Sequence, residues 1–218
     1  METCCVGKHN RLNLCNQSNK DLPFFILDDI SHCYKCLRNA AINKKLILNN
    51  QEFSMRLIDE KRKKYPSLAK MLSTNTLYPS DIMNEKESLN ISNPEVIQVM
   101  KDIGTPCLKA AAEYFEHCRI LFDVMHSLDP IYKKENSKSK TMELSSKKEA
   151  LIKVQSWFNN WNDQKVPKSQ LKQKLSPITL KNVLNTIEST LNLIETKDIK
   201  EISRHHQFQH ILMNISLV

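Results

Sequence analysis

The clearest helical pattern in the chain lies in residues 105–130, TPCLKAAAEYFEHCRILFDVMHSLDP. Thr105 followed by Pro106 is typical of a helix start, and Asp129-Pro130 of a helix end. Between them the apolar residues alternate steps of three and four: Leu108, Ala111, Phe115, Cys118, Phe122 and Met125. This heptad-like spacing predicts one long helix that buries a narrow apolar seam against a partner helix.

Upstream of this segment the same helical period recurs. Residues 24–64 are predicted to form one long helix, or two helices joined near Asn49-Asn50. Asn93 followed by Pro94 favours an N-cap, and Gly104 is typical of the residue that ends such a helix. We therefore expect helices to fill most of the chain before residue 105.

Downstream, two more helix starts stand out. Ser146 and Glu149 form a capping-box pattern, and Trp157 and Trp161 are expected to anchor that helix in the core. Ser176-Pro177 opens a second helix, whose apolar seam consists of Leu180, Leu184, Ile187, Leu191 and Ile194. A last helix is expected from Ile199 to Met213. The spacing again indicates helices that each need a partner.

No segment alternates between apolar and polar residues as a half-buried strand does. The expected fold is therefore all-α, with long helices in a bundle or coiled-coil-like arrangement, and with two helical halves joined by a basic linker. The expected boundaries are a flexible leader at 1–20, an N-terminal helical region at 21–130, the basic linker at 131–145 and a C-terminal helical region at 146–218.

Composition excludes several function classes. The chain has only 2 glycines, whereas phosphate-binding loops and dinucleotide fingerprints need several. Scarce glycine also disfavours tight β-hairpins. We expect no transmembrane segment and no signal peptide, because no apolar run is long enough and the first 20 residues are polar, and therefore a cytoplasmic or nuclear protein whose 7 cysteines are reduced.

The positive charge is concentrated in one part of the chain. Residues 131–181 hold twelve of the 32 basic residues but only four of the 24 acidic ones. Such a face attracts acidic surfaces, although a merely solvated face remains the alternative. The candidate polyanion-binding residues are Lys133, Lys134, Lys147, Lys148, Lys168, Lys172 and Lys174. Because this segment has lysines and no arginine, sequence-specific reading of nucleic acid is not expected.

Several cysteines and histidines could in principle carry chemistry. His32, Cys33 and Cys36 include a C-x-x-C spacing, but its position within a helix favours two buried thiols over a metal site. The cluster His205, His206 and His210 lacks the companion glutamate of a zinc-binding helix. We expect no resident metal or cofactor, and leave metal binding by the histidine cluster open.

Two smaller features concern the surface. Cys4 and Cys5 lie together near the N-terminus and are a candidate for S-acylation, which would bring the chain to a membrane. Asp59 and Glu60 are expected to be solvated helix positions.

Two functional hypotheses follow. The first is a non-enzymatic subunit or adaptor that binds other helical subunits of a larger intracellular assembly. Its candidate seam residues, either core or interface, are Leu108, Phe115, Phe122, Leu184, Ile187 and Leu191. The second is a binder of an acidic polymer or surface, such as microtubules, nucleic acid or an anionic membrane, through the lysines of residues 131–181. A metal enzyme using His206 and His210 would need a further ligand from elsewhere in the chain.

Overall fold

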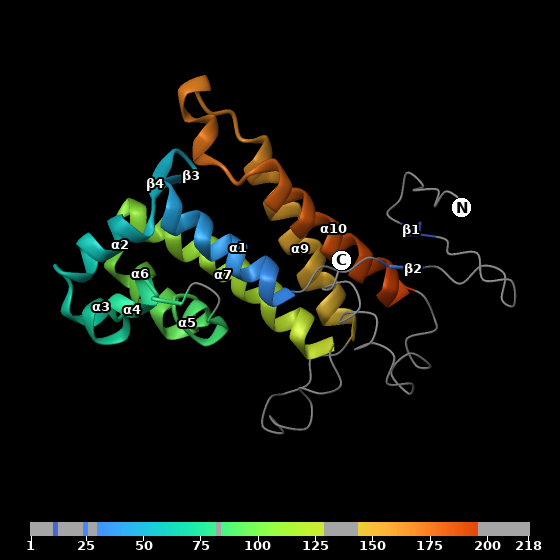
Figure 1. Ribbon diagram of the computed structural model, residues 1–218, viewed down its shortest axis with the longest axis horizontal. Helices are drawn as coiled ribbons and strands as arrows, with labels where there is room; N and C mark the ends of the chain where they lie inside the picture. Colours follow the sequence, from blue (N-terminus) through green and yellow to red (C-terminus); the bar gives the residue numbers. More distant parts are fainter. Residues whose placement is uncertain (1–10, 13–23, 26–29, 82–83, 129–143, 196–218) are drawn as a thin grey trace, which may run out of the picture.

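The computed structural model describes residues 11–12, 24–25, 30–81, 84–128 and 144–195 (Figure 1). These residues are mainly helical. The long helices are α1 (Ile30–Asn43), α6 (Pro94–Ile103), α7 (Pro106–Leu128), α9 (Leu144–Asp163) and α10 (Pro177–Glu195). Shorter ones are α2 (Met55–Arg62), α3 (Pro66–Met71), α4 (Thr74–Leu77), α5 (Glu85–Asn90) and the 3-10 helix η1 (Lys168–Gln173).

Two small antiparallel strand pairs accompany the helices. β1 (Arg11–Leu12) pairs with β2 (Phe24–Phe25), and β3 (Leu46–Leu48) pairs with β4 (Gln51–Phe53). The second pair is a hairpin between α1 and α2, and it packs on α7. The fold is therefore mainly helical, as expected, but not purely α.

Helix α7 lies at the centre of the arrangement. It packs against α6 and α1, and also against α9 and β4 (Figure 1). On one side of α7 the short helices α2 to α5 gather with α6. On the other side α9 and α10 run alongside each other, joined by η1 (Figure 1).

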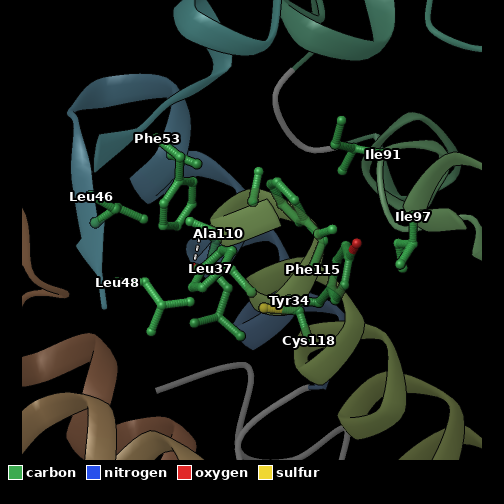
Figure 2. Close-up of a cluster of buried hydrophobic side chains, with 14 of the residues drawn as sticks. Tyr34, Leu37, Leu46, Leu48, Phe53, Ile91, Ile97, Ala110, Phe115 and Cys118 are labelled. Carbon is green, nitrogen blue, oxygen red and sulfur yellow. Dashed lines mark hydrogen bonds between the residues drawn. The ribbon is translucent and has the colours of Figure 1, made fainter. Parts of the chain in front are cut away.

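One hydrophobic core joins these parts. Tyr34 and Leu37 of α1, together with Phe115 and Cys118 of α7, lie within it (Figure 2). The same cluster includes Phe158 of α9, so the regions predicted before and after the linker share one core. The described helices pack as a globular assembly, and no coiled coil is seen among them.

The main error in the predicted fold lies in residues 24–64. The structure places the β3–β4 hairpin where a continuous helix was one expectation, and helices on either side of Asn49-Asn50 were the other. Asn49 and Asn50 both have positive φ, 52° and 60°. Such a turn twists in the sense that a two-residue hairpin requires, and asparagine adopts this conformation more readily than most residues. The scarcity of glycine therefore did not prevent a hairpin.

Several predicted helix ends are confirmed. The side chain of Asn93 accepts a hydrogen bond from the amide of Glu95 at 3.0 Å, and Gly104 ends α6 with φ 72°. The hydroxyl of Ser176 accepts from the amide of Thr179 at 3.1 Å at the start of α10. The predicted start at Ser146 is wrong, because α9 already begins at Leu144.

Candidate interaction surface at the α9–α10 corner

The segment that connects α9 to α10 is basic and contains no acidic residue. We define the α9–α10 corner as residues 164–181, which include η1 and the first turn of α10. It contains Lys165, Lys168, Lys172, Lys174 and Lys181. The sequence has no acidic residue between Asp163 and Glu188. The corner projects from one end of the molecule, beside the β3–β4 hairpin (Figure 1).

Lys174 fixes the corner to the end of α9. Its ammonium group donates to the carbonyl oxygens of Asn162 and Gln164, which lie at the C-terminal end of that helix. Carbonyl groups at this end have no partner within the helix, and a lysine there also interacts favourably with the helix dipole. Burial lowers the pKa of Lys174, and the nearby Asp163 opposes this effect. Lys174 is therefore a structural cap.

A second lysine joins the corner to α1. The ammonium group of Lys44, which follows α1, donates to the backbone carbonyl of Lys174. Burial lowers the pKa of Lys44 as well. The two lysines thus link the ends of α1 and α9 through one short loop.

The β3–β4 hairpin holds the corner from the other side. Asn49 and Gln164 make two hydrogen bonds: the Asn49 amide to Oε1 at 3.0 Å, and Nε2 of Gln164 to Oδ1 of Asn49 at 2.7 Å. Further along the loop, Nε2 of Gln173 donates to Oε1 of Glu52 at 3.3 Å. These contacts join segments more than a hundred residues apart, so the corner has a defined conformation.

Two aliphatic side chains are exposed on this anchored segment. Leu171 of η1 is 57% exposed and Ile178 of α10 is 74% exposed. Among the described residues the other exposed large hydrophobic side chains are Tyr78 at 41% and Ile152 at 43%. The side chains of Lys165, Lys172 and Lys181 are exposed in the same segment. The corner therefore combines positive charge with apolar surface.

The lysines predicted to bind a polyanion differ in their exposure to solvent. Lys172 is exposed, as a polyanion-binding residue must be, and Lys148 is half-buried. Lys147 is only 5% exposed, so it is not displayed on the surface as its assignment to polyanion binding requires. It lies in the first turn of α9. Lys168 begins η1.

Most of the predicted seam lies inside the chain's own core. Leu108, Phe115 and Ile187 are fully buried, and Phe122 is 5% exposed. Leu184 and Leu191 of α10 are half-buried and pack against the same core. Within the described residues, a partner helix could reach only the last two of these six side chains.

The two tryptophans anchor α9 as predicted. Nε1 of Trp157 donates to Oε1 of Glu113 on α7 at 2.8 Å, and its ring stacks on His117 with centroids 4.2 Å apart. Trp161 is buried and donates to the backbone of Ile47. Both rings therefore serve packing between helices and the hairpin: Trp161 is buried, and the half-buried Trp157 has one face stacked on His117.

The cysteines in the described residues form no disulfide, namely Cys33, Cys36, Cys107 and Cys118. Cys33 is buried, as expected, whereas Cys36 is half-buried with its Sγ 3.5 Å from Nε2 of His32. Among the described residues, no group of three or more histidine, cysteine, aspartate or glutamate side chains is arranged to hold a metal ion.

Other predicted features lie outside the described residues. These are Lys133 and Lys134 of the linker, Cys4 and Cys5 of the leader, and the cluster His205, His206 and His210. The expected helix from Ile199 to Met213 also falls there.

Asp59 is a structural residue that the sequence did not reveal. The expectation that it is solvated is wrong, because it is only 9% exposed and lies 2.8 Å from Arg62 and 3.0 Å from Lys63. Arg62 also donates to the carbonyl of Leu72 at 3.3 Å and to the hydroxyl of Thr74 at 3.2 Å. The pair therefore ties α2 to the segment between α3 and α4.

Leu171 and Ile178 were also missed as candidate surface residues. A signal was present, because both are apolar residues within a lysine-rich stretch without acids, and Ile178 lies off the seam of Leu180, Leu184 and Ile187. Helical periodicity identifies the apolar residues that a helix buries. It does not identify apolar residues that lie off the buried face and are exposed.

Comparison with protein-family models, with curated proteins and with solved structures finds no match to this chain. Within the described residues, none of the helices combines the length and the apolar character needed to cross a bilayer.

Proposed function

We propose that this chain is a non-enzymatic binding protein that docks onto an acidic surface through its α9–α10 corner. One observation carries the proposal: Leu171 and Ile178 are exposed among lysines on a segment held by hydrogen bonds from three sides. A surface that only keeps a protein soluble needs the lysines alone. The added aliphatic side chains favour a surface that makes contacts.

Charge indicates the sign of the partner. The corner carries five lysines without an intervening acid, and Lys165, Lys172 and Lys181 have exposed side chains. Exposed charges of one sign attract an opposite surface over roughly a Debye length, about 8 Å at physiological salt. Binding should therefore weaken steeply as salt is added.

The side-chain chemistry argues against reading of nucleotide sequence. The corner has no arginine, which is the residue best suited to recognise base edges. Trp161 is buried and Trp157 is half-buried with its ring stacked on His117, so neither tryptophan is an exposed platform for bases.

The test compares two charge-reversal triples. K165E/K172E/K181E changes exposed lysines of the corner, and K64E/K70E/K86E changes exposed lysines around α2 to α5. Binding of each purified protein to poly-L-glutamate, duplex DNA and phosphatidylserine vesicles is measured at low and high salt. We expect the corner triple to lose binding and the control triple to lose far less. Equal loss in both triples, or no binding to any probe, contradicts the proposal.

A second candidate is the adaptor that binds another helical subunit. It is supported by Leu184 and Leu191 on α10. Both belong to the predicted seam, and both are half-buried, so part of each side chain is accessible to a partner. This hypothesis predicts a complex that survives high salt and is lost in an L184S/L191S variant with unchanged circular dichroism. A complex that is insensitive to this variant would exclude the α10 seam.

A further inference from the structure

We propose that the acidic surface is an anionic lipid membrane, into which Leu171 and Ile178 insert while the neighbouring lysines contact the head groups. This inference rests on the proposed function and specifies its ligand. It assigns the membrane contact to the α9–α10 corner, far along the chain from the cysteines Cys4 and Cys5 that suggested acylation.

The shape of the corner suits a flat surface. Residues of η1 stand out at one extremity of the molecule, with the β3–β4 hairpin set back beside them (Figure 1). Leu171 lies on this projecting turn, and Ile178 lies in the first turn of α10 that follows it. A projecting segment can reach a bilayer surface without obstruction, whereas a bound peptide would need a groove to enclose it.

The two kinds of side chain fit the two layers of a bilayer surface. Leucine and isoleucine offer hydrocarbon, and lipid tails accept it, whereas DNA backbones and acidic protein tails present mainly polar groups. Lysine carries a flexible stem with a single ammonium group, which can reach phosphate and carboxylate head groups while its methylenes stay among apolar neighbours. Lys165, Lys172 and Lys181 are the exposed lysines able to do this.

The backbone of the turn is prepared for a poorly hydrated environment. The backbone amide of Gln170 donates to the carbonyl oxygen of Pro167 at 2.8 Å. The backbone amide of Lys174 donates to the carbonyl oxygen of Leu171 at 3.4 Å. Backbone groups already paired inside the turn lose less hydration when the turn enters the interfacial region. Lys174 and Gln164 hold the turn in place beforehand, so insertion requires little further ordering.

The experiment measures flotation of the full-length protein with phosphatidylcholine vesicles that contain about one third phosphatidylserine, and with vesicles of phosphatidylcholine alone. The apolar variant is L171S/I178S. Its matched control is I152S, which removes an exposed isoleucine from the middle of α9, away from the corner. The charge variants are the two triples used above, and circular dichroism confirms that each protein is folded.

We expect binding to the anionic vesicles and little to the neutral ones. L171S/I178S should lower the partition coefficient at least about tenfold, because it removes the apolar contact. K165E/K172E/K181E should lower it by about a hundredfold or more, since each lysine near an anionic surface contributes roughly fivefold. I152S and K64E/K70E/K86E should each stay within about threefold of the unmodified protein.

The outcomes separate this inference from the function on which it rests. Binding to DNA or poly-L-glutamate that depends on the corner lysines, without binding to anionic vesicles, would overturn the membrane assignment and keep the proposed function. Vesicle binding that I152S reduces as much as L171S/I178S does would overturn the insertion. Failure to bind any acidic probe would overturn both.

Discussion

The indole nitrogen of Trp161 lies 2.5 Å from the carbonyl oxygen of Ile47, a residue 114 positions earlier in the chain. This buried hydrogen bond joins α9 to β3, and its neighbours Asn49 and Gln164 extend the contact to the tip of the hairpin. The β3–β4 hairpin therefore holds the end of α9, and with it the α9–α10 corner, in position.

Replacing Trp161 by phenylalanine should lower the free energy of unfolding by about 2 kcal/mol, since a buried carbonyl loses its donor and the smaller ring leaves space. The matched control is W157F, whose partner Glu113 is half-buried and can bind water instead. It should cost about 1 kcal/mol. Urea denaturation followed by far-ultraviolet circular dichroism gives both values. Equal costs would show that the Trp161 hydrogen bond adds nothing.

The hairpin turn predicts an unusual response to glycine. Asn50 has φ 60° and an exposed side chain, so Asn50→Gly should leave stability unchanged or raise it by up to about 1 kcal/mol. Asn50→Ala should lower stability by about 1 kcal/mol, because alanine is strained at positive φ. Thermal unfolding of the two variants distinguishes these outcomes. If alanine is tolerated as well as glycine, the turn does not have this backbone conformation in solution.

This turn also shows why residues 24–64 were predicted incorrectly. Leu46, Ile47 and Leu48 are all buried, so the strand shows no alternation that would separate it from a helix. Asn49-Asn50 was identified as a break, but nothing local required strands around it. By contrast, the end of α6 depends on Asn93, Pro94 and Gly104 themselves, and such local caps could be predicted from sequence.

Asp59 predicts a loss of stability in acid. Burial alone would raise the pKa of this carboxyl group, but hydrogen bonds and charge from Lys63 and Arg62 outweigh burial and hold the pKa below its ordinary value. The folded state therefore favours the ionised form. Its stabilising contribution is present above the unfolded pKa, about 4, and disappears as pH falls through the lower folded value.

Asp59→Asn should accordingly lower stability at neutral pH by roughly 1 to 3 kcal/mol and flatten the decline below about pH 4. Urea titrations across that range measure both effects. Glu60→Gln is the control, because Glu60 pairs with Arg56 at 3.4 Å on the exposed surface, and such pairs contribute little. A parallel acid response in D59N and the unmodified protein would contradict the assignment to Asp59.

Lys174 should behave as a helix cap and not as a surface charge. Lys174→Met keeps most of the side-chain volume but removes the donor to Asn162 and Gln164, so we expect a loss of about 1 to 2 kcal/mol in unfolding free energy. Lys172→Met, at an exposed position in η1, should change stability by less than about 0.5 kcal/mol. Chemical denaturation of the two variants tests this difference, and equal stabilities would remove Lys174 from its structural role.

The candidate site could be predicted only in part. The local concentration of lysines was visible in the sequence, because charge is a property of composition. The distribution of these lysines between surface and interior depends on packing: Lys147 is buried in α9, Lys174 is a cap, and Lys172 is exposed. The exposure of Leu171 follows from the course of the loop, which long-range contacts with the hairpin determine.

The most direct test of the central proposal places a reporter at the corner itself. Leu171→Trp adds an indole at a 57% exposed position, whereas the native Trp161 is buried and Trp157 is half-buried against the core. With vesicles of anionic lipid that carry brominated tails, we expect a blue shift and quenching for L171W. The control I152W should show neither. Quenching of I152W alone, or unchanged emission from L171W on vesicles that bind the protein, would contradict the assignment of the α9–α10 corner as the docking surface.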